Sequence, residues 1–115
     1  MITIPKPTNT DLVEIEAHAD QMGIFLDLHL DLDANNKPYI WLGELMRTSG
    51  EKGSGRRALE NLFAYADDHD LPIRAAVLCW NEALLAYYSD LGFEVIRDGT
   101  PHSLDDHSTI ERSPH

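Results

Sequence analysis

The sequence predicts a mixed α/β fold of the layered α+β kind. Residues 25–33 alternate apolar and polar side chains, and residues 39–47 form a second, apolar strand after a turn. A glycine-rich loop, an amphipathic helix and another apolar strand follow in that order. This strand–helix–strand connection places two parallel strands beside an antiparallel hairpin, so we expect a mixed sheet packed against helices.

The composition favours a single domain over residues 1–115, with an irregular lead-in at 1–9 and a polar tail at 99–115. The formal net charge is −11 and no region forms a basic stripe, which argues against nucleic acid as a partner. Cys79 is the only cysteine and fits a reducing compartment. Because no apolar run is long enough to span a membrane, we expect a cytoplasmic protein without membrane contact.

The N-terminal half predicts one helix and one hairpin. Asp11 followed by Glu14 is typical of a helix start, and Gly23 would end that helix. The stripe of apolar residues expected to face the core is Leu12, Ile15, Ala19 and Met22. The strand at 25–33 would place its leucines inward and its Asp and His side chains in water, and the turn residues at 34–38 would connect it to the second strand.

The C-terminal half predicts a helix from Arg56 to about His69. Its buried stripe would consist of Ala58, Leu59, Leu62, Phe63 and Ala66. Residues 73–79 lack clean alternation, which indicates a central strand buried on both faces. A helix from Asn81 or Glu82 to Gly92 would then turn Leu84, Leu85, Tyr88 and Leu91 inward. Residues 93–96 form a strand, and residues 108–111 are candidates for a last short one.

The run Gly50-Glu51-Lys52-Gly53-Ser54-Gly55-Arg56-Arg57 contains the strongest functional signal. It holds Lys52, Arg56 and Arg57 of the chain's nine basic residues at the start of a helix, where the helix dipole disfavours cations. The exposed N–H groups of a helix start bind anions, and glycines let the backbone approach a phosphate. We therefore expect a phosphate-bearing, nucleotide-like ligand at this loop.

Two familiar phosphate motifs fit this run poorly. Walker A requires Gly-Lys-Ser/Thr at its end, whereas this loop has Gly55-Arg56-Arg57. The segment from Gly53 to Ala58 matches the dinucleotide pattern G-x-G-x-x-A, but no acidic residue closes the next strand. The chain is also too short for both halves of a dinucleotide-binding fold.

A third pattern fits better. Residues 50–55 resemble the Gln/Arg-x-x-Gly-x-Gly/Ala loop of the GCN5-related N-acetyltransferase (GNAT) superfamily. Residues 81–93, which read NEALLAYYSDLGF, resemble the family's N-x-x-A-x-x-x-Y-x-x-x-G-F helix at the expected distance. The resemblance covers about residues 39–98 and implies a mixed, mostly antiparallel central sheet flanked by helices. Gly50 replaces the usual Gln or Arg, Leu84 replaces an alanine, and the N-terminal part is shortened.

The resemblance implies acetyl-CoA (coenzyme A) as cofactor, bound between two strands that splay apart after Arg47 and Cys79. Backbone groups near the end of the first of these strands would pair with the pantetheine arm, and the loop amides would hold the pyrophosphate. The cofactor-binding residues implied in this way are Leu45, Met46, Arg47, Lys52, Gly53, Ser54, Gly55, Arg56, Arg57 and Asn81.

The same resemblance implies an N-acetyltransferase in which a primary amine attacks the thioester directly. Tyr88 would be the acid that protonates the leaving thiolate, and Glu44 is the candidate base, with His29 as the alternative. The acceptor would be a small molecule or a protein lysine or N-terminus. Without the resemblance, Tyr88 reads as a core aromatic and Glu44 as a solvent-facing strand residue.

Other residues point to weaker hypotheses. Asp27, His29, Asp31 and Asp33 share one strand face, which favours a solvated surface over a metal site and could attract a cationic acceptor. The exposed hairpin edge offers a surface for a homodimer. The alternative function is a non-catalytic, acidic interaction module on the same fold, with or without CoA, that acts on a partner protein.

Overall fold

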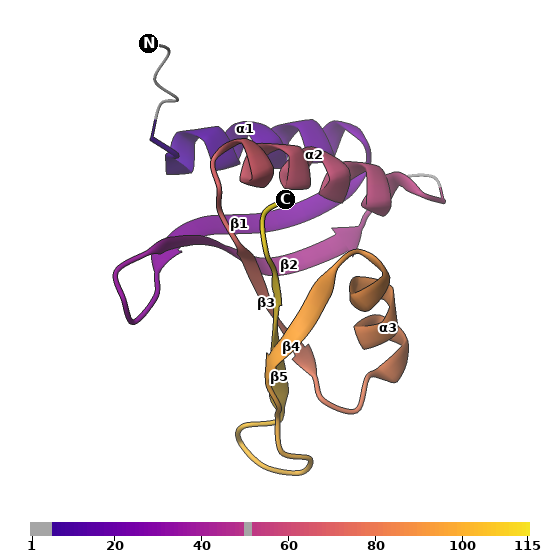
Figure 1. The fold of residues 1–115 in the computed structure, drawn as a ribbon. Coiled ribbons are helices and arrows are strands. Elements are labelled where there is room, and N and C mark those ends of the chain that lie inside the picture. The colour runs from indigo at the N-terminus through magenta and orange to yellow at the C-terminus, as the bar shows by residue number, and fades with distance from the viewer. Residues whose placement is uncertain (1–5, 50–51) are drawn as a thin grey trace.

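The computed structural model of this protein describes residues 6–49 and 52–115. These residues form three helices and five strands (Figure 1). In chain order the elements are α1 (Asn9–Gln21), β1 (Ile24–Leu32), β2 (Pro38–Arg47), α2 (Ser54–Asp68), β3 (Ile73–Leu78), α3 (Glu82–Asp90), β4 (Phe93–Arg97) and β5 (His107–Arg112). No helix of the described residues is both long and apolar enough to cross a membrane.

The strands form one mixed sheet in the order β1-β2-β3-β5-β4. β1 and β2 are an antiparallel hairpin, and α2 crosses over so that β3 runs parallel to β2. β5 pairs antiparallel with both β3 and β4. The predicted mixed sheet is therefore confirmed. The predicted short C-terminal strand is also confirmed: it is β5, and it lies inside the sheet between β3 and β4.

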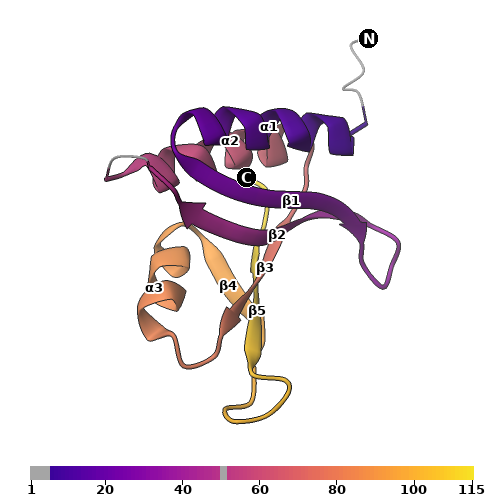
Figure 2. The ribbon, with the colours of Figure 1, turned by 180° about the vertical axis from the view of Figure 1, so that it is seen from behind.

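Two helices cover the hairpin. α1 and α2 lie side by side over β1 and β2, while α3 stands beside β4 at the other end of the sheet (Figures 1 and 2). β2 leads toward α2 and β3 leads toward α3, and the two strands separate toward these ends. The candidate site lies there.

α1 begins earlier than the sequence indicates. Its N-cap is Thr8, whose hydroxyl accepts from the Asp11 N–H at 3.2 Å while the Asp11 carboxylate accepts from the Thr8 N–H at 3.3 Å. The predicted pair Asp11 and Glu14 was wrong, because Asp11 is at position N3 of the capping box and not at the N-cap. The predicted end is confirmed: Gly23 has φ +75°, a conformation that favours glycine.

β1 shows the predicted alternation over most of its length. Leu26 and Leu28 are buried, and Asp27 and His29 are exposed. Leu32 breaks the pattern and is exposed, because α1 covers β1 only as far as Leu30. The side chain of Asn9, the first residue of α1, bonds to the Leu30 N–H at 3.0 Å.

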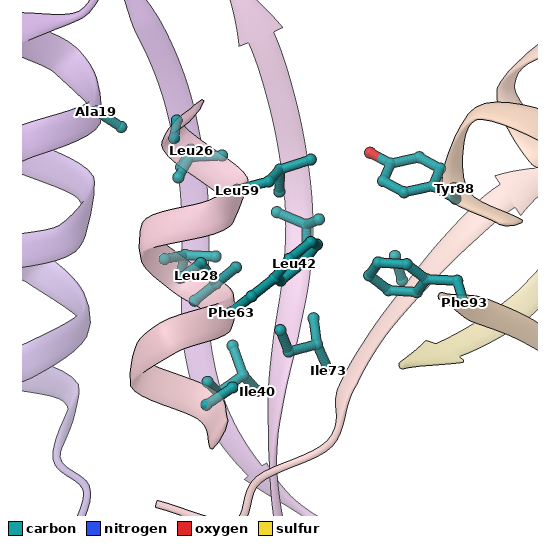
Figure 3. Packing of buried hydrophobic residues seen from close by; sticks show 14 of the residues in the cluster. Ala19, Leu26, Leu28, Ile40, Leu42, Leu59, Phe63, Ile73, Tyr88 and Phe93 are labelled. Carbon is teal, nitrogen blue, oxygen red and sulfur yellow. The ribbon is translucent and has the colours of Figure 1, made fainter. Parts of the chain in front are cut away.

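The core forms between α2 and the sheet. The predicted α2 stripe is confirmed in full, since all five of its residues are buried. Phe63 and Phe93 belong to this core (Figure 3), and their ring centroids lie 5.9 Å apart. The Arg112 guanidinium lies 4.2 Å from the centre of the Phe63 ring. Arg112 also donates to both Asp67 oxygens, at 2.9 and 3.1 Å, so an ion pair ties β5 to α2.

Two predictions about the C-terminal half were wrong. β3 is not buried on both faces: Ile73, Ala75 and Val77 are buried, whereas Ala76 is exposed. Only one face of β3 packs into the core. On α3, Leu84 does not turn fully inward and is 36% exposed, because it lies at the rim of the space between β2 and β3. Gly92, with φ +98°, ends the α3 segment as predicted.

Candidate functional site

The parallel strands β2 and β3 separate half-way along their length. They pair at Ile40 with Ile73, at Trp41 with Arg74 and at Leu42 with Ala75, and the described pairing stops there. Beyond this point β2 continues to Arg47 beside β1, and β3 continues to Leu78 beside β5. Between the diverging strands, backbone groups of both are free to bind a third extended chain.

A cleft of about 120 Å³ occupies this separation. β2 and β3 form its walls and α3 closes one end of it. Its lining residues are Leu42, Gly43, Glu44, Leu45, Ala75, Ala76, Val77, Leu84 and Tyr88. The walls are mainly apolar, and the side chains that bring chemistry to them are Glu44 and Tyr88. The predicted acid and base therefore lie in the same cleft.

A β-bulge at Gly43 marks the start of the separation. β1 residues Asp27 and Leu28 pair with Glu44 and Leu42, so Gly43 is the extra residue. A Cβ at Gly43 would lie 2.8 Å from the Asp27 carboxylate oxygen and 3.5 Å from Nε1 of Trp41. The Asp27 carboxylate and the Trp41 indole therefore lie close to the space that a side chain at this position would occupy. Gly43 was not among the predicted site residues, although glycine inside a predicted strand is a signal for a bulge.

Tyr88 lies deep in the site, with 6% of its surface exposed. Its ring packs edge-on against Phe93 at 5.2 Å and Tyr87 at 5.4 Å, and its hydroxyl points away from Phe93 (Figure 3). Burial, with a smaller contribution from Tyr87, raises the pKa of Tyr88 above its usual value. The phenol is thus protonated at neutral pH and can donate a proton at the cleft.

Glu44 lies directly across from Asp27 in the β1–β2 pair, so the two carboxylates share one face of the sheet. Glu44 lines the cleft and is exposed at its mouth. His29, the alternative base, pairs with Trp41 beyond the bulge and is not among the cleft-lining residues. The geometry therefore favours Glu44 over His29.

The last residues of β2 extend the cleft toward the loop. Leu45 is half-buried and lines the cleft, whereas Met46 and Arg47 are exposed at the strand end. All of them pair on one side with β1. Their opposite backbone side is directed toward the gap that β3 leaves, where a third extended chain can pair.

The start of α2 presents backbone N–H groups that have no partner among residues 6–49 and 52–115. Gly53 is the N-cap, with φ +92°, and has no side chain to cap the helix. The first helical bond from this end runs from the Arg57 N–H to the Gly53 carbonyl at 3.2 Å. The N–H groups of Ser54, Gly55 and Arg56 precede that bond and have no acceptor inside the helix. Such a helix end binds anions.

Three cations surround this helix end. Lys52, Arg56 and Arg57 are exposed, and the first turn of α2 contains no acidic residue. Arg57 donates to the Ser54 hydroxyl at 3.3 Å, while Arg56 forms an exposed ion pair with Glu60 at 3.3 Å. Gly50, the first position of the predicted loop motif, lies outside the described residues.

Asn81 has a structural role at the start of α3. Its side-chain oxygen accepts from the Leu84 N–H at 3.1 Å and caps the helix. Asparagine at this position is well explained by capping alone, and its contact with a cofactor stays a prediction.

Cys79 is a free, half-buried thiol one residue past β3. Among the described residues no three His, Cys, Asp or Glu side chains gather in a way that could hold a metal ion.

No model of a known protein family matches this chain, and neither does any curated protein sequence. Solved structures do match its fold. The chain is similar to Naa20 of Chaetomium thermophilum in complex with a bisubstrate analogue, with a TM-score of 0.64 and 14% identity over 96% of this chain and 75% of that one. It is also similar to Naa50 of Arabidopsis thaliana with a bisubstrate analogue containing CoA, with a TM-score of 0.60 and 12% identity over 96% and 97%.

A third match is the ribosomal-protein-S18-alanine N-acetyltransferase of Escherichia coli. Its TM-score is 0.61, at 19% identity over 98% of this chain and 94% of that one. At such identities the likeness concerns the fold alone, and the fold is that of the GNAT superfamily. The fold expected from the two sequence motifs is therefore confirmed.

Proposed function

We propose that this protein is an acetyl-CoA-dependent N-acetyltransferase whose acceptor is a primary amine. The observation that carries the proposal is the separation of β2 from β3 after Leu42 and Ala75, with the Tyr88 hydroxyl at the cleft between them. The start of α2 supports it as well, because its first turn has no acidic residue and its N-cap Gly53 has no capping side chain, so the helix end can accept an anion. The matched structures with bisubstrate analogues share this fold.

Acetyl-CoA supplies the acetyl thioester, and the residues of this chain bind and orient it. The free backbone side of Leu45–Arg47 pairs with the pantetheine amides. The N–H groups at Ser54, Gly55 and Arg56 take the pyrophosphate, and Lys52 and Arg57 add positive charge. A backbone N–H at the end of β2 polarises the thioester carbonyl.

The transfer needs two proton movements. The neutral acceptor amine forms a C–N bond at the thioester carbonyl carbon, and Glu44, directly or through water, takes the proton that the nitrogen then loses. When the C–S bond breaks, Tyr88 gives its proton to the thiolate. Because burial raises the pKa of Tyr88 above its usual value, Tyr88 is protonated before each turnover.

The test measures thiol release from acetyl-CoA with spermidine, free lysine and a peptide with an unblocked N-terminus as acceptors. Tyr88→Phe should lower turnover by about 10²-fold or more while CoA affinity stays unchanged, because only a proton donor is lost. Tyr87→Phe is the matched control and should retain activity. Glu44→Gln should lower turnover, because the general base is lost. Equal activity of Tyr88→Phe and Tyr87→Phe would contradict the proposed roles.

One observation favours the second candidate function, a non-catalytic acidic interaction module that acts on a partner protein. The cleft holds only about 120 Å³, whereas small-molecule sites commonly measure about 300–1,000 Å³. A module of this kind would bind its partner equally well with Tyr88→Phe and would release no thiol with any of the acceptors.

The proposal extends to location and partners. The free thiol of Cys79 suits the reducing cytoplasm, where we place the protein. The acceptor is a small-molecule amine or a protein lysine or N-terminus. Sedimentation of the purified chain tests a homodimer, and fractionation of cells tests the location.

A further inference from the structure

The outer edge of β1 carries no strand among the described residues, because β1 is the first strand in the sheet order. α1 covers part of this edge with side chains. Glu16 accepts from the Leu28 N–H at 2.8 Å, and Asn9 accepts from the Leu30 N–H at 3.0 Å. Such bonds occupy backbone donors that another strand would otherwise use.

The other half of the edge lies beyond these caps. N–H groups two residues apart in a strand point to the same side. Because the N–H of Leu28 points outward to α1, those of Ile24 and Leu26 also point outward. The side chains of both residues are buried in the core. The edge at residues 24–27 therefore presents backbone donors and acceptors from a rigid, well-anchored strand.

A groove of about 460 Å³ runs between this half of the edge and α1. Its apolar part includes Val13, which is 58% exposed, and Phe25, which is 41% exposed. Its rim carries the carboxylates of Glu16, Asp20 and Asp27. None of the described lining residues is basic. The groove combines an open strand edge, apolar contact area and negative charge.

We propose that the β1 edge at residues 24–27 binds an extended, basic peptide segment of a partner protein by strand addition. The peptide backbone pairs with the outward groups of Ile24 and Leu26. Its apolar side chains contact Val13 and Phe25, and its Lys or Arg side chains meet the carboxylate rim. A second copy of this chain fits less well, because an antiparallel β1–β1 pair would bring two such acidic rims together.

The probe is a synthetic peptide of about six residues that alternates valine and lysine, long enough to span the four edge residues at about 3.3 Å per residue. Its counterpart replaces each lysine by glutamate. Two further versions carry N-methyl groups on one or the other alternate set of amides. Binding to the full chain is measured by backbone amide shifts and by hydrogen exchange, without acetyl-CoA. The outcome therefore does not depend on the proposed acetyl transfer.

Two substitutions on the protein are matched. Val13→Lys places a cation in the groove, and Leu32→Lys adds the same charge on β1 beyond the capped region. Both native side chains are 58% exposed, so neither change disturbs the core. We expect Val13→Lys to weaken lysine-peptide binding at least about tenfold, because like charges meet in the groove. Leu32→Lys should leave binding within about twofold.

The expected result is binding of the lysine peptide with protection of the Ile24 and Leu26 amides, little shift at Leu28 and Leu30, and no binding of the glutamate peptide. N-methylation of one alternate set should abolish binding, whereas methylation of the other set should not. Failure of the lysine peptide to bind at about 1 mM, a level that detects even weak complexes, would overturn the proposal. So would concentration-dependent protection of the same amides without peptide, which would assign the edge to a second copy.

Discussion

Arg57 lies in the first turn of α2, a position that is unfavourable for a cation in an isolated helix. The first turn of α2 holds Arg56 and Arg57 and no acid, and the N-cap Gly53 offers no side-chain acceptor. The helix dipole is positive at this end, so each cation there is unfavourable. If these arginines serve an anionic ligand, reversing the charge of Arg57 should change folding stability and ligand affinity in opposite directions.

The magnitudes follow from the local geometry. Arg57→Glu changes the net charge from −11 to −13, because it removes one positive and adds one negative charge. Each charge at a helix end contributes about 0.3–1 kcal/mol, and the weak bond to the Ser54 hydroxyl is lost, so we expect a net gain of about 0.5 kcal/mol without ligand. Two charges about 5 Å apart in water interact by roughly 0.8 kcal/mol. Against a diphosphate, the charge reversal should weaken the binding free energy by about 2 kcal/mol after screening. This corresponds to a loss of roughly 30-fold in CoA affinity.

The assay pairs thermal unfolding without ligand with calorimetric CoA binding at low and physiological salt. Lys37→Glu is the control, since it makes the same change in net charge on an exposed loop. We expect Arg57→Glu to melt about 2 °C higher than the native protein and to bind CoA weakly, with the larger loss at low salt. Lys37→Glu should bind CoA normally. Equal CoA affinity of the two variants would refute the assignment of Arg57 to a phosphate site.

Two further predictions concern ionisable groups outside the cleft. Hydrogen bonds from Arg112 lower the pKa of Asp67, so this stabilisation is complete above about pH 4 and falls as the pH drops further toward the folded pKa. Asp67→Asn should lower the free energy of unfolding by about 3 kcal/mol in urea titrations, because it leaves the buried Arg112 charge unpaired. A change below about 0.5 kcal/mol would contradict a stabilising role of this ion pair. Burial and then the bond to Asp11 raise the pKa of Tyr65 to about 12, so its stabilisation is lost as pH rises from about 10 through that value. Absorbance titration should show a late phenolate that Tyr65→Phe removes.

Local patterns in the sequence predicted most of the architecture. The alternation in β1 and the apolar stripe of α2 each depend on a repeat that the residues themselves display. Gly23 and Gly92 ended their helical segments as expected, since both adopt positive φ angles. The crossover through α2 then required a parallel neighbour for β2. These features follow from short-range rules, so they could be predicted from a single sequence.

Features that depend on neighbouring elements were missed or wrong. At the Gly43 bulge, the Asp27 carboxylate of the neighbouring strand lies 2.8 Å from where a Cβ would stand, a contact between two strands that no local pattern reveals. Leu84 has the spacing of a core residue, yet it lies at the rim where β2 and β3 diverge. The extent of that separation depends on which residues stop pairing, here Leu42 and Ala75. The site's position was predictable from its motifs, whereas its depth and walls were not.

The central claim is that the cleft and the start of α2 bind acetyl-CoA, and the melting temperature with and without millimolar acetyl-CoA tests it most directly. A ligand at about 100 times its dissociation constant stabilises the native state by roughly 2.7 kcal/mol, which for a domain of this size raises the melting temperature by several degrees. Binding at this site should give this rise with acetyl-CoA and none with equal concentrations of ATP or NAD. An unchanged melting temperature with acetyl-CoA, or an equal rise with all three compounds, would contradict it.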